Sequence, residues 1–191
     1  MNILLYGIQG SGKSTQGKLL SRHLHLPYLS TGHIFRQMAK ESTREGRYIK
    51  ETLAAGLLIP DEITIPIIEK YLARSEYRKG WILDGFPRTI NQAEKFKTKT
   101  DVAFYLMVND KEALWRLSFR IDDKGAIRED ETLMALRKRI DLFHKVTKPV
   151  LEYFRKKDIL VEIDGERSIE EILNDIIGKI RWYERGNGNS R

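Results

Sequence analysis

Cysteine is absent from this chain of 191 residues. Disulfide bonds, thiolate nucleophiles and cysteine-ligated zinc are therefore excluded, and the composition suits a reducing compartment such as the cytosol. No apolar run approaches the roughly 18 residues that a membrane-spanning helix requires. The start MNILLYGIQG also lacks the basic segment and long apolar segment of a secretory signal. We therefore expect a cytoplasmic protein without a membrane partner.

Acidic residues are outnumbered by basic ones. The chain has 34 Lys and Arg against 27 Asp and Glu, which gives a formal net charge of +7. Such an excess favours anionic partners such as nucleotides or nucleic acids, although a solvated basic surface without any ligand has the same charge. With 41% hydrophobic residues, a chain of this length can bury one core, and we expect a single domain.

Short apolar runs that end at glycine or aspartate recur along the chain and predict strands. They cover residues 3–6, 81–83, 102–108 and 159–163, with residues 28–29 as a weaker fifth candidate. Helical patterns follow them, and Ser168-Ile-Glu-Glu predicts a capped start for the last helix. The alternation predicts an α/β fold with a five-stranded parallel sheet flanked by helices, and ligands at the carboxyl ends of the strands.

Two stretches do not fit the strand–helix repeat. Residues 30–59 form a helical pattern without a strand of its own, and residues 120–128 form a polar loop. We interpret both as insertions that cover a site. The core of the domain then consists of residues 1–29, 60–119 and 129–191.

The most specific local pattern is Gly-Ile-Gln-Gly-Ser-Gly-Lys-Ser at residues 7–14, which fits G-x-x-x-x-G-K-[ST] in full. It lies between a predicted strand and a predicted helix, so it predicts a loop whose backbone N–H groups hold phosphate oxygens. Lys13 is expected to reach the β- and γ-phosphates of a nucleotide, and the Ser14 hydroxyl to meet Mg²⁺. The loop alone leaves open GTPases, motor ATPases and small-molecule kinases.

Arginine spacing in the second half of the chain predicts a basic cleft. Arg116 and Arg120 are four residues apart on a predicted helix and therefore face the same way. Arg128 and Arg139 are eleven apart, close to three helical turns, and share a face if their helix begins near Arg128. We expect both pairs to converge on one site, with a solvated arginine face as the alternative.

The segment Leu83-Asp84-Gly85-Phe86-Pro87-Arg88-Thr89, followed by Gln92-Ala93, closely resembles the signature of the adenylate kinase family. The similarity extends to about Tyr183 and includes Ser30-Thr31-Gly32, Arg36, residues 56–62, Arg128, residues 139–149 and residues 163–165. The resemblance implies a P-loop NTPase fold and reversible transfer of a phosphoryl group from ATP to AMP, which gives two ADP. In that family, residues 30–59 would close over the monophosphate and residues 120–128 over ATP.

The resemblance also implies the site residues. Contacts with ATP are expected from Gly10, Ser11, Gly12, Lys13, Ser14, Thr15, Arg116, Arg120 and Arg167. Contacts with AMP are expected from Thr31, Arg36, Leu57, Leu58, Ile59, Gly85, Phe86, Pro87, Arg88, Gln92, Arg128 and Arg139. Catalysis is expected from Lys13, Arg88, Arg120, Arg128 and Arg139, because phosphoryl transfer depends on alignment and charge stabilisation. Ser14 and Asp84 are expected to hold Mg²⁺, partly through water.

Three residues depart from the family pattern. Gln9 stands where proline is usual, Ser14 where glycine is common, and His33 where aspartate usually follows Thr-Gly. With histidine at position 33, the carboxylate that relatives have near the Mg²⁺ waters is missing. This difference affects the expected rate and metal dependence more than the expected function. The alternative is that His33 is a surface residue without a role. The short loop 120–128 lacks the cysteines of zinc-binding relatives, so we expect no zinc site.

Two other functions stay open from the sequence. One is a kinase for UMP, CMP or GMP, because selectivity for the base rests on small contacts such as those of Gln92 and Thr31. The other is a P-loop nucleic-acid-binding or regulatory ATPase, which the net charge would suit. The chain lacks a basic stripe interleaved with aromatic residues, so we expect no nucleic-acid partner. The resemblance implies a monomer that binds ATP, AMP and ADP.

Overall fold

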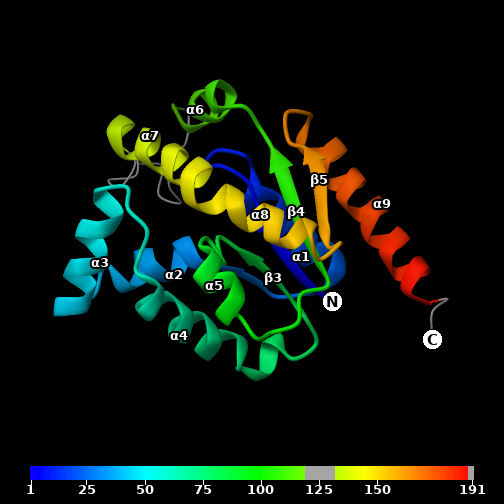
Figure 1. Ribbon diagram of the computed structural model, residues 1–191, viewed down its shortest axis with the longest axis horizontal. Coiled ribbons are helices and arrows are strands. Elements are labelled where there is room, and N and C mark those ends of the chain that lie inside the picture. Colours follow the sequence, from blue (N-terminus) through cyan, green and yellow to red (C-terminus); the bar gives the residue numbers. More distant parts are fainter. Residues whose placement is uncertain (119–131, 189–191) are drawn as a thin grey trace.

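The computed structural model describes residues 1–118 and 132–188 of the chain. Five parallel strands in this part form one sheet in the order β2-β3-β1-β4-β5 (Figure 1). The strands are β1 (Asn2–Tyr6), β2 (Tyr28–Ser30), β3 (Trp81–Asp84), β4 (Val102–Met107) and β5 (Leu160–Asp164). The predicted α/β class and five-stranded parallel sheet are confirmed, including the weaker candidate at residues 28–29.

Helices connect the strands and cover the sheet. They are α1 (Lys13–Leu24), α2 (Thr31–Met38), α3 (Arg44–Ala54), α4 (Asp61–Leu72), α5 (Ile90–Lys95), α6 (Asp110–Ser118), α7 (Leu133–Leu142), α8 (Lys148–Arg155) and α9 (Ile169–Gly188). A short 3₁₀ turn, η1 (Ser75–Tyr77), precedes β3. A π-helical turn, η2 (Phe143–Thr147), joins α7 to α8 in one continuous helical segment. Such turns are often found at functional sites.

Side chains alternate across the strands and build a core on each face of the sheet. On one face, Leu4 and Leu83 pack with Phe154 of α8 and other buried residues. On the other face, Leu5 packs with residues of α1 and α9 such as Leu20 and Ile176. Figure 1 shows α8 crossing in front of the strands. The sheet is therefore buried on both faces, as parallel sheets require.

The predicted insertion at residues 30–59 contains α2, α3 and the last residue of β2. Phe35, Ile49 and Ile59 form a separate small cluster, against which Ile63 and Ile67 of α4 pack. Helices α2 and α3 lie to one side of the sheet, away from α9 (Figure 1). The predicted covering loop at residues 120–128 lies outside the described residues.

The strand register places the carboxyl ends of β1, β2 and β3 side by side, so the loops that follow them begin at the same end of the sheet. Leu5 of β1 pairs with Asp84 of β3, and Asp84 pairs with Ser30 of β2. The chain leaves β1 toward β2 on one side of the sheet and leaves the neighbouring β3 toward β4 on the other side. Ligands bind at such a reversal of direction in open α/β folds.

The start of α9 follows the predicted capping box. Ser168 Oγ accepts from the backbone N–H of Glu171, and the Glu171 carboxylate accepts from the backbone N–H of Ser168. These reciprocal bonds satisfy donors that the first helical turn leaves without partners. None of the helices in residues 1–118 and 132–188 has the length and apolar character needed to cross a membrane.

Two helical glycines offer a matched test of the packing of α1. A Cβ at Gly17 would lie 2.3 Å from Tyr28 Cε2 and 3.1 Å from Leu5 Cδ1, whereas a Cβ at Gly178 of α9 meets no described atom within 4 Å. Alanine is favoured over glycine in a helix by about 1 kcal/mol, while overpacking a core costs about 1–3 kcal/mol. We expect Gly178→Ala to raise the free energy of unfolding and Gly17→Ala to lower it, measured by urea denaturation. A Gly17→Ala protein more stable than the parent would contradict the close contact of α1 with Tyr28.

Candidate functional site

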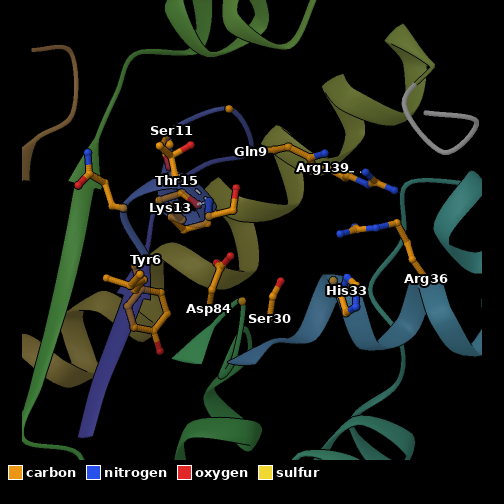
Figure 2. A pocket seen from close by; sticks show the side chains of 18 of the residues that line it. Tyr6, Gln9, Ser11, Lys13, Thr15, Ser30, His33, Arg36, Asp84 and Arg139 are labelled. Atoms are coloured by element: carbon orange, nitrogen blue, oxygen red, sulfur yellow. Dashed lines mark hydrogen bonds between the residues drawn. The ribbon is translucent and has the colours of Figure 1, made fainter. Parts of the chain in front are cut away.

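A cavity of about 1910 Å³ opens at the carboxyl edge of the sheet. It exceeds the roughly 300–1,000 Å³ typical of a site for one small molecule, so it has room for two. Its walls come from the loop after β1, the starts of α1 and α2, the end of β3, and residues of α3, α6, α7 and α9. Figure 2 shows side chains of the loop after β1, of α1, α2 and α7, and of the end of β3 around the same space.

The loop after β1 has the backbone that its glycines predict. Gly10 and Gly12 have φ angles of 90° and 87°, in the left-handed region that favours glycine, and a Cβ at Gly10 would lie 2.5 Å from the carbonyl oxygen of Ala113. Helix α1 then begins at Lys13. The Lys13 ammonium donates to the carbonyls of Gly7 (2.7 Å) and Ile8 (2.8 Å), so it lies against the loop. The predicted strand–loop–helix arrangement is present.

Asp84 ends β3 at the floor of the cavity. It is 7% exposed, and one of its carboxylate oxygens accepts a 2.8 Å hydrogen bond from the Tyr28 hydroxyl. Burial, and after it the charge of Asp84, raises the pKa of Tyr28 far above its usual value, so this hydroxyl stays protonated and donates. The Tyr28 contact thus fixes the orientation of the carboxylate.

Residues 85–89 form a loop that positions Arg88. Its guanidinium donates from Nε to the carbonyl of Gly85 at 2.7 Å. Two threonines brace the backbone around it: Thr31 Oγ1 donates to the Gly85 carbonyl at 3.0 Å, and Thr147 Oγ1 donates to the Arg88 carbonyl at 3.1 Å. The Phe86–Pro87 peptide bond within the loop is cis.

The guanidinium of Arg88 is buried, so its charge is poorly solvated. Burial lowers the pKa of its guanidinium, Asp84 raises it in part, and Arg139 lowers it further. Even so, an arginine remains protonated in proteins. A desolvated cation of this kind is stabilised by an anion that enters the cavity.

Arg139 connects two walls of the cavity. From α7, it donates through Nη1 to the side-chain oxygen of Gln9 at 3.3 Å and through Nη2 to the carbonyl of Leu53 in α3 at 2.8 Å. Figure 2 shows Arg139 and Arg36 approaching each other across the opening. Lys13, Arg36, Arg88 and Arg139 all line the cavity, so it concentrates positive charge.

Two other predicted arginines lie at the far wall, beside α6 and α9. Arg116 donates to the Glu112 carboxylate and to the carbonyl of Gly165, both at 2.8 Å or less. Arg167 bonds to Asp175, and both arginines line the cavity. The hydrogen bond to Asp175 raises the pKa of Arg167, and the charges of Asp175 and Asp164 raise it further. Arg120 and Arg128 lie outside the described residues.

The residues predicted to contact AMP divide into two groups. Arg36, Leu57, Leu58, Gly85, Arg88 and Arg139 line the cavity. The side chains of Thr31, Ile59, Phe86, Pro87 and Gln92 are buried and lie behind its wall. The amide of Gln92 bonds to protein at both ends, to the backbone N–H of Arg88 and to Asp61. Its contact with the base of a nucleotide stays a prediction.

All three residues that depart from the family pattern, Gln9, Ser14 and His33, line the cavity. His33 is exposed and lines it near Arg36, and Gln9 contacts Arg139 (Figure 2). Tyr28 and Asp61, whose hydrogen bonds fix Asp84 and Gln92, have no functional signal in the sequence. Tyr28 lies in the predicted strand at residues 28–29 and Asp61 in the similar segment 56–62, but only the fold brings them to Asp84 and Gln92.

Comparisons with known proteins extend over nearly the whole chain. The family model described as adenylate kinase matches residues 5–159. A protein named adenylate kinase from Methanocella arvoryzae is 36% identical over 213 residues, covering 95% of this chain and 99% of that protein. Another of that name, from Azobacteroides pseudotrichonymphae, is 38% identical over 187 residues, with 94% and 97% covered. A third, from Caldanaerobacter subterraneus, is 36% identical over 208 residues, with 92% and 94% covered.

The bond between Tyr28 and Asp84 predicts a pH-dependent stability difference. A hydrogen bond to a charged group contributes about 1.5–3 kcal/mol, so Tyr28→Phe should lower the free energy of unfolding by that amount at pH 8. The folded pKa of Tyr28 lies above its unfolded value of about 10, so this stabilisation is complete below pH 10 and is lost above it. The difference in free energy of unfolding between the parent and Tyr28→Phe should be smaller by about 1.4 kcal/mol at pH 11 than at pH 8, measured by denaturant titration.

The exposed Tyr48 on α3 provides the control for this measurement, since Tyr48→Phe should change stability by less than about 0.5 kcal/mol at either pH. If Tyr28→Phe matched the parent at pH 8, the hydroxyl would contribute nothing to holding Asp84.

Proposed function

The chain belongs to the adenylate kinase family, and from this premise we propose that its cleft transfers a phosphoryl group reversibly between ATP and AMP, giving two ADP. The chain is thus a nucleoside monophosphate kinase, a phosphotransferase. The observation that carries the proposal is one cavity with room for two small molecules. A phosphate-binding loop forms one wall, and Arg36, Arg88 and Arg139 line the cavity from other elements.

The chemistry requires little acid–base help, because the accepting phosphate oxygen is already anionic. Alignment and charge stabilisation then supply most of the catalysis. In the proposed mechanism, the backbone N–H groups of residues 10–15 and Lys13 hold the phosphates of ATP. Arg88 and Arg36 bind the AMP phosphate through their planar donor groups, and Arg139 reaches the phosphates of both nucleotides. Arg120 and Arg128 are proposed to add charge from the covering loop.

The protein groups facing the cavity suit Mg²⁺. Ser14 offers a hydroxyl and Asp84 a carboxylate, both on the cavity wall. Within residues 1–118 and 132–188, His, Cys, Asp and Glu nowhere gather in a group of three that could hold a metal. Mg²⁺ typically keeps several waters and binds through one or two protein oxygens and substrate phosphates, so this sparse donor set fits it. When bound, Mg²⁺ would neutralise charge on the phosphate oxygens.

Residues 30–59 and 120–128 are proposed as the covers over AMP and ATP. The small separate cluster of Phe35, Ile49 and Ile59 supports the first, because a segment with its own packing can shift as a unit. Closure would exclude water from the reacting phosphate and so limit hydrolysis of ATP. As the family resemblance implies, we propose a monomer that acts in the cytosol.

The direct test is a coupled assay of ADP formation from Mg·ATP with AMP, UMP, CMP and GMP supplied in turn. We expect rapid turnover with AMP and little with the others. If the protein preferred another monophosphate, the proposed mechanism would stand and only the proposed substrate would change. If none of the four were phosphorylated, the proposal would be overturned, and binding of oligonucleotides would be the next measurement.

Helix α7 carries a matched pair of arginines that separates catalysis from surface charge. Arg139 lines the cavity, whereas Arg137 on the same helix is exposed and absent from its wall. Removing one preorganised donor to a developing charge lowers kcat by about 10²–10³-fold. We therefore expect Arg139→Ala to lose kcat by about that factor and Arg137→Ala to stay within about twofold of the parent in the same assay. Equal losses in the two variants would contradict the role given to Arg139.

A further inference from the structure

Asp61, the first residue of α4, accepts three side-chain hydrogen bonds from the segment that begins α5. Gln92 Nε2 donates to its Oδ1 at 2.6 Å. Thr89 Oγ1 and Asn91 Nδ2 donate to its Oδ2 at 2.9 and 2.6 Å. Thr89 also caps α5, because its Oγ1 accepts from the backbone N–H of Gln92 at 3.0 Å. The Asp61 carboxylate thus holds the side chains of the first turn of α5 in place, and it has no role in the proposed mechanism.

The contacts of Gln92 fix which way its amide points. An ionised carboxylate only accepts hydrogen bonds, so the NH₂ end must face Asp61. At the other end, Oε1 accepts from the backbone N–H of Arg88 at 2.6 Å, and that group only donates. Rotating the amide by 180° would place oxygen against carboxylate and NH₂ against N–H, which removes both bonds. With Gln92 only 2% exposed, these protein groups rather than water set its orientation.

Beyond these two contacts, the fixed amide has one further donor and one further acceptor, which a base would have to reach behind the cavity wall. A glutamine side chain has two N–H donors and two oxygen lone pairs, and each end here uses one of them on the contacts just described. An adjacent donor and acceptor of this kind pair with adenine, which offers a ring nitrogen that accepts beside an amino group that donates. Guanine presents O6 as an acceptor where adenine has that amino group. The orientation of the amide therefore decides which base it fits.

We propose that Asp61 is a specificity-determining positioning residue, which selects AMP by holding the Gln92 amide in the one orientation that matches adenine. The inference rests on the proposed function and on the predicted contact of Gln92 with the base of AMP. Asp61 itself does not touch the substrate, and it acts from α4, 31 positions before Gln92.

The test compares Asp61→Asn with Glu62→Gln. Asparagine has nearly the shape of aspartate but can donate as well as accept, so it removes the constraint that Asp61 places on the Gln92 amide. Only the Arg88 backbone N–H then opposes the rotated orientation. Glu62 is the matched control, because it is exposed and is the other acidic residue in the first turn of α4. Each substitution removes one negative charge from that helix terminus, so a general effect on α4 would appear in both.

The readout is the ratio of kcat/KM for AMP to that for GMP. A bidentate contact with a base contributes about 1–3 kcal/mol of discrimination, so Asp61→Asn should lower the ratio by about 5- to 150-fold. KM for AMP should rise more than kcat falls, and KM for ATP should stay unchanged. Glu62→Gln should keep the parent ratio.

The outcomes distinguish a failure of the role given to Asp61 from a failure of the proposed function. A parent protein that does not prefer AMP overturns the proposed function. A parent that prefers AMP, with a folded Asp61→Asn variant that keeps the same ratio, overturns the role of Asp61 alone. If circular dichroism shows that Asp61→Asn does not fold, Asp61→Ser decides the question, because its hydroxyl also donates and accepts. An unchanged ratio in Asp61→Ser would likewise refute the inference.

Discussion

Parallel register at the carboxyl ends of β1, β2 and β3 is the constraint on which the rest of the site depends. Because Leu5, Ser30 and Asp84 lie at the same level of the sheet, the loops that follow them leave it at one edge. That edge places the loop before α1 beside Asp84 and beside the start of α2. A slip of one residue in any of these strands would turn its side chains to the opposite face and separate the groups.

Three cations of the cavity, Lys13, Arg88 and Arg139, donate to backbone carbonyl oxygens. Lys13 donates to Gly7 and Ile8, Arg88 donates to Gly85, and Arg139 donates to Leu53. A carbonyl is a neutral acceptor, so each such bond fixes the direction of a side chain without cancelling its charge. The peripheral Arg155, by contrast, contacts the carboxylates of Glu152 and Glu162. Preorganised positive charge is what a phosphoryl transition state requires.

Local patterns were sufficient to predict the sheet and the phosphate loop. Each buried strand is a short apolar run that ends at a turn residue, and residues 7–14 contain both the glycines and the lysine that the loop needs. The resemblance carried by residues 83–89 added Arg36, Arg88 and Arg139, and the structure brings all three to one cavity. The arginine spacing alone left a solvated face as the alternative.

The contacts that orient the site could not be predicted in the same way. Tyr28 and Asp84 are 56 positions apart, and Asp61 and Gln92 are 31 apart, so neither pair has a local signal. The sequence suggested Gln92 as a reader of the base, whereas the structure adds that protein groups hold both ends of its amide. Such pairings depend on which elements become neighbours, and that is decided by the packing of the whole sheet.

Arg139 makes the two halves of the cavity thermodynamically interdependent. One of its nitrogens donates to Gln9 in the phosphate loop and another to Leu53 in α3. An anion that draws this guanidinium toward either wall changes the free energy of its contact with the other. Linkage requires such an effect to be reciprocal, so occupancy of the loop and the position of α3 must influence each other to the same extent. Arg139 is thus a physical link between the phosphate loop and α3.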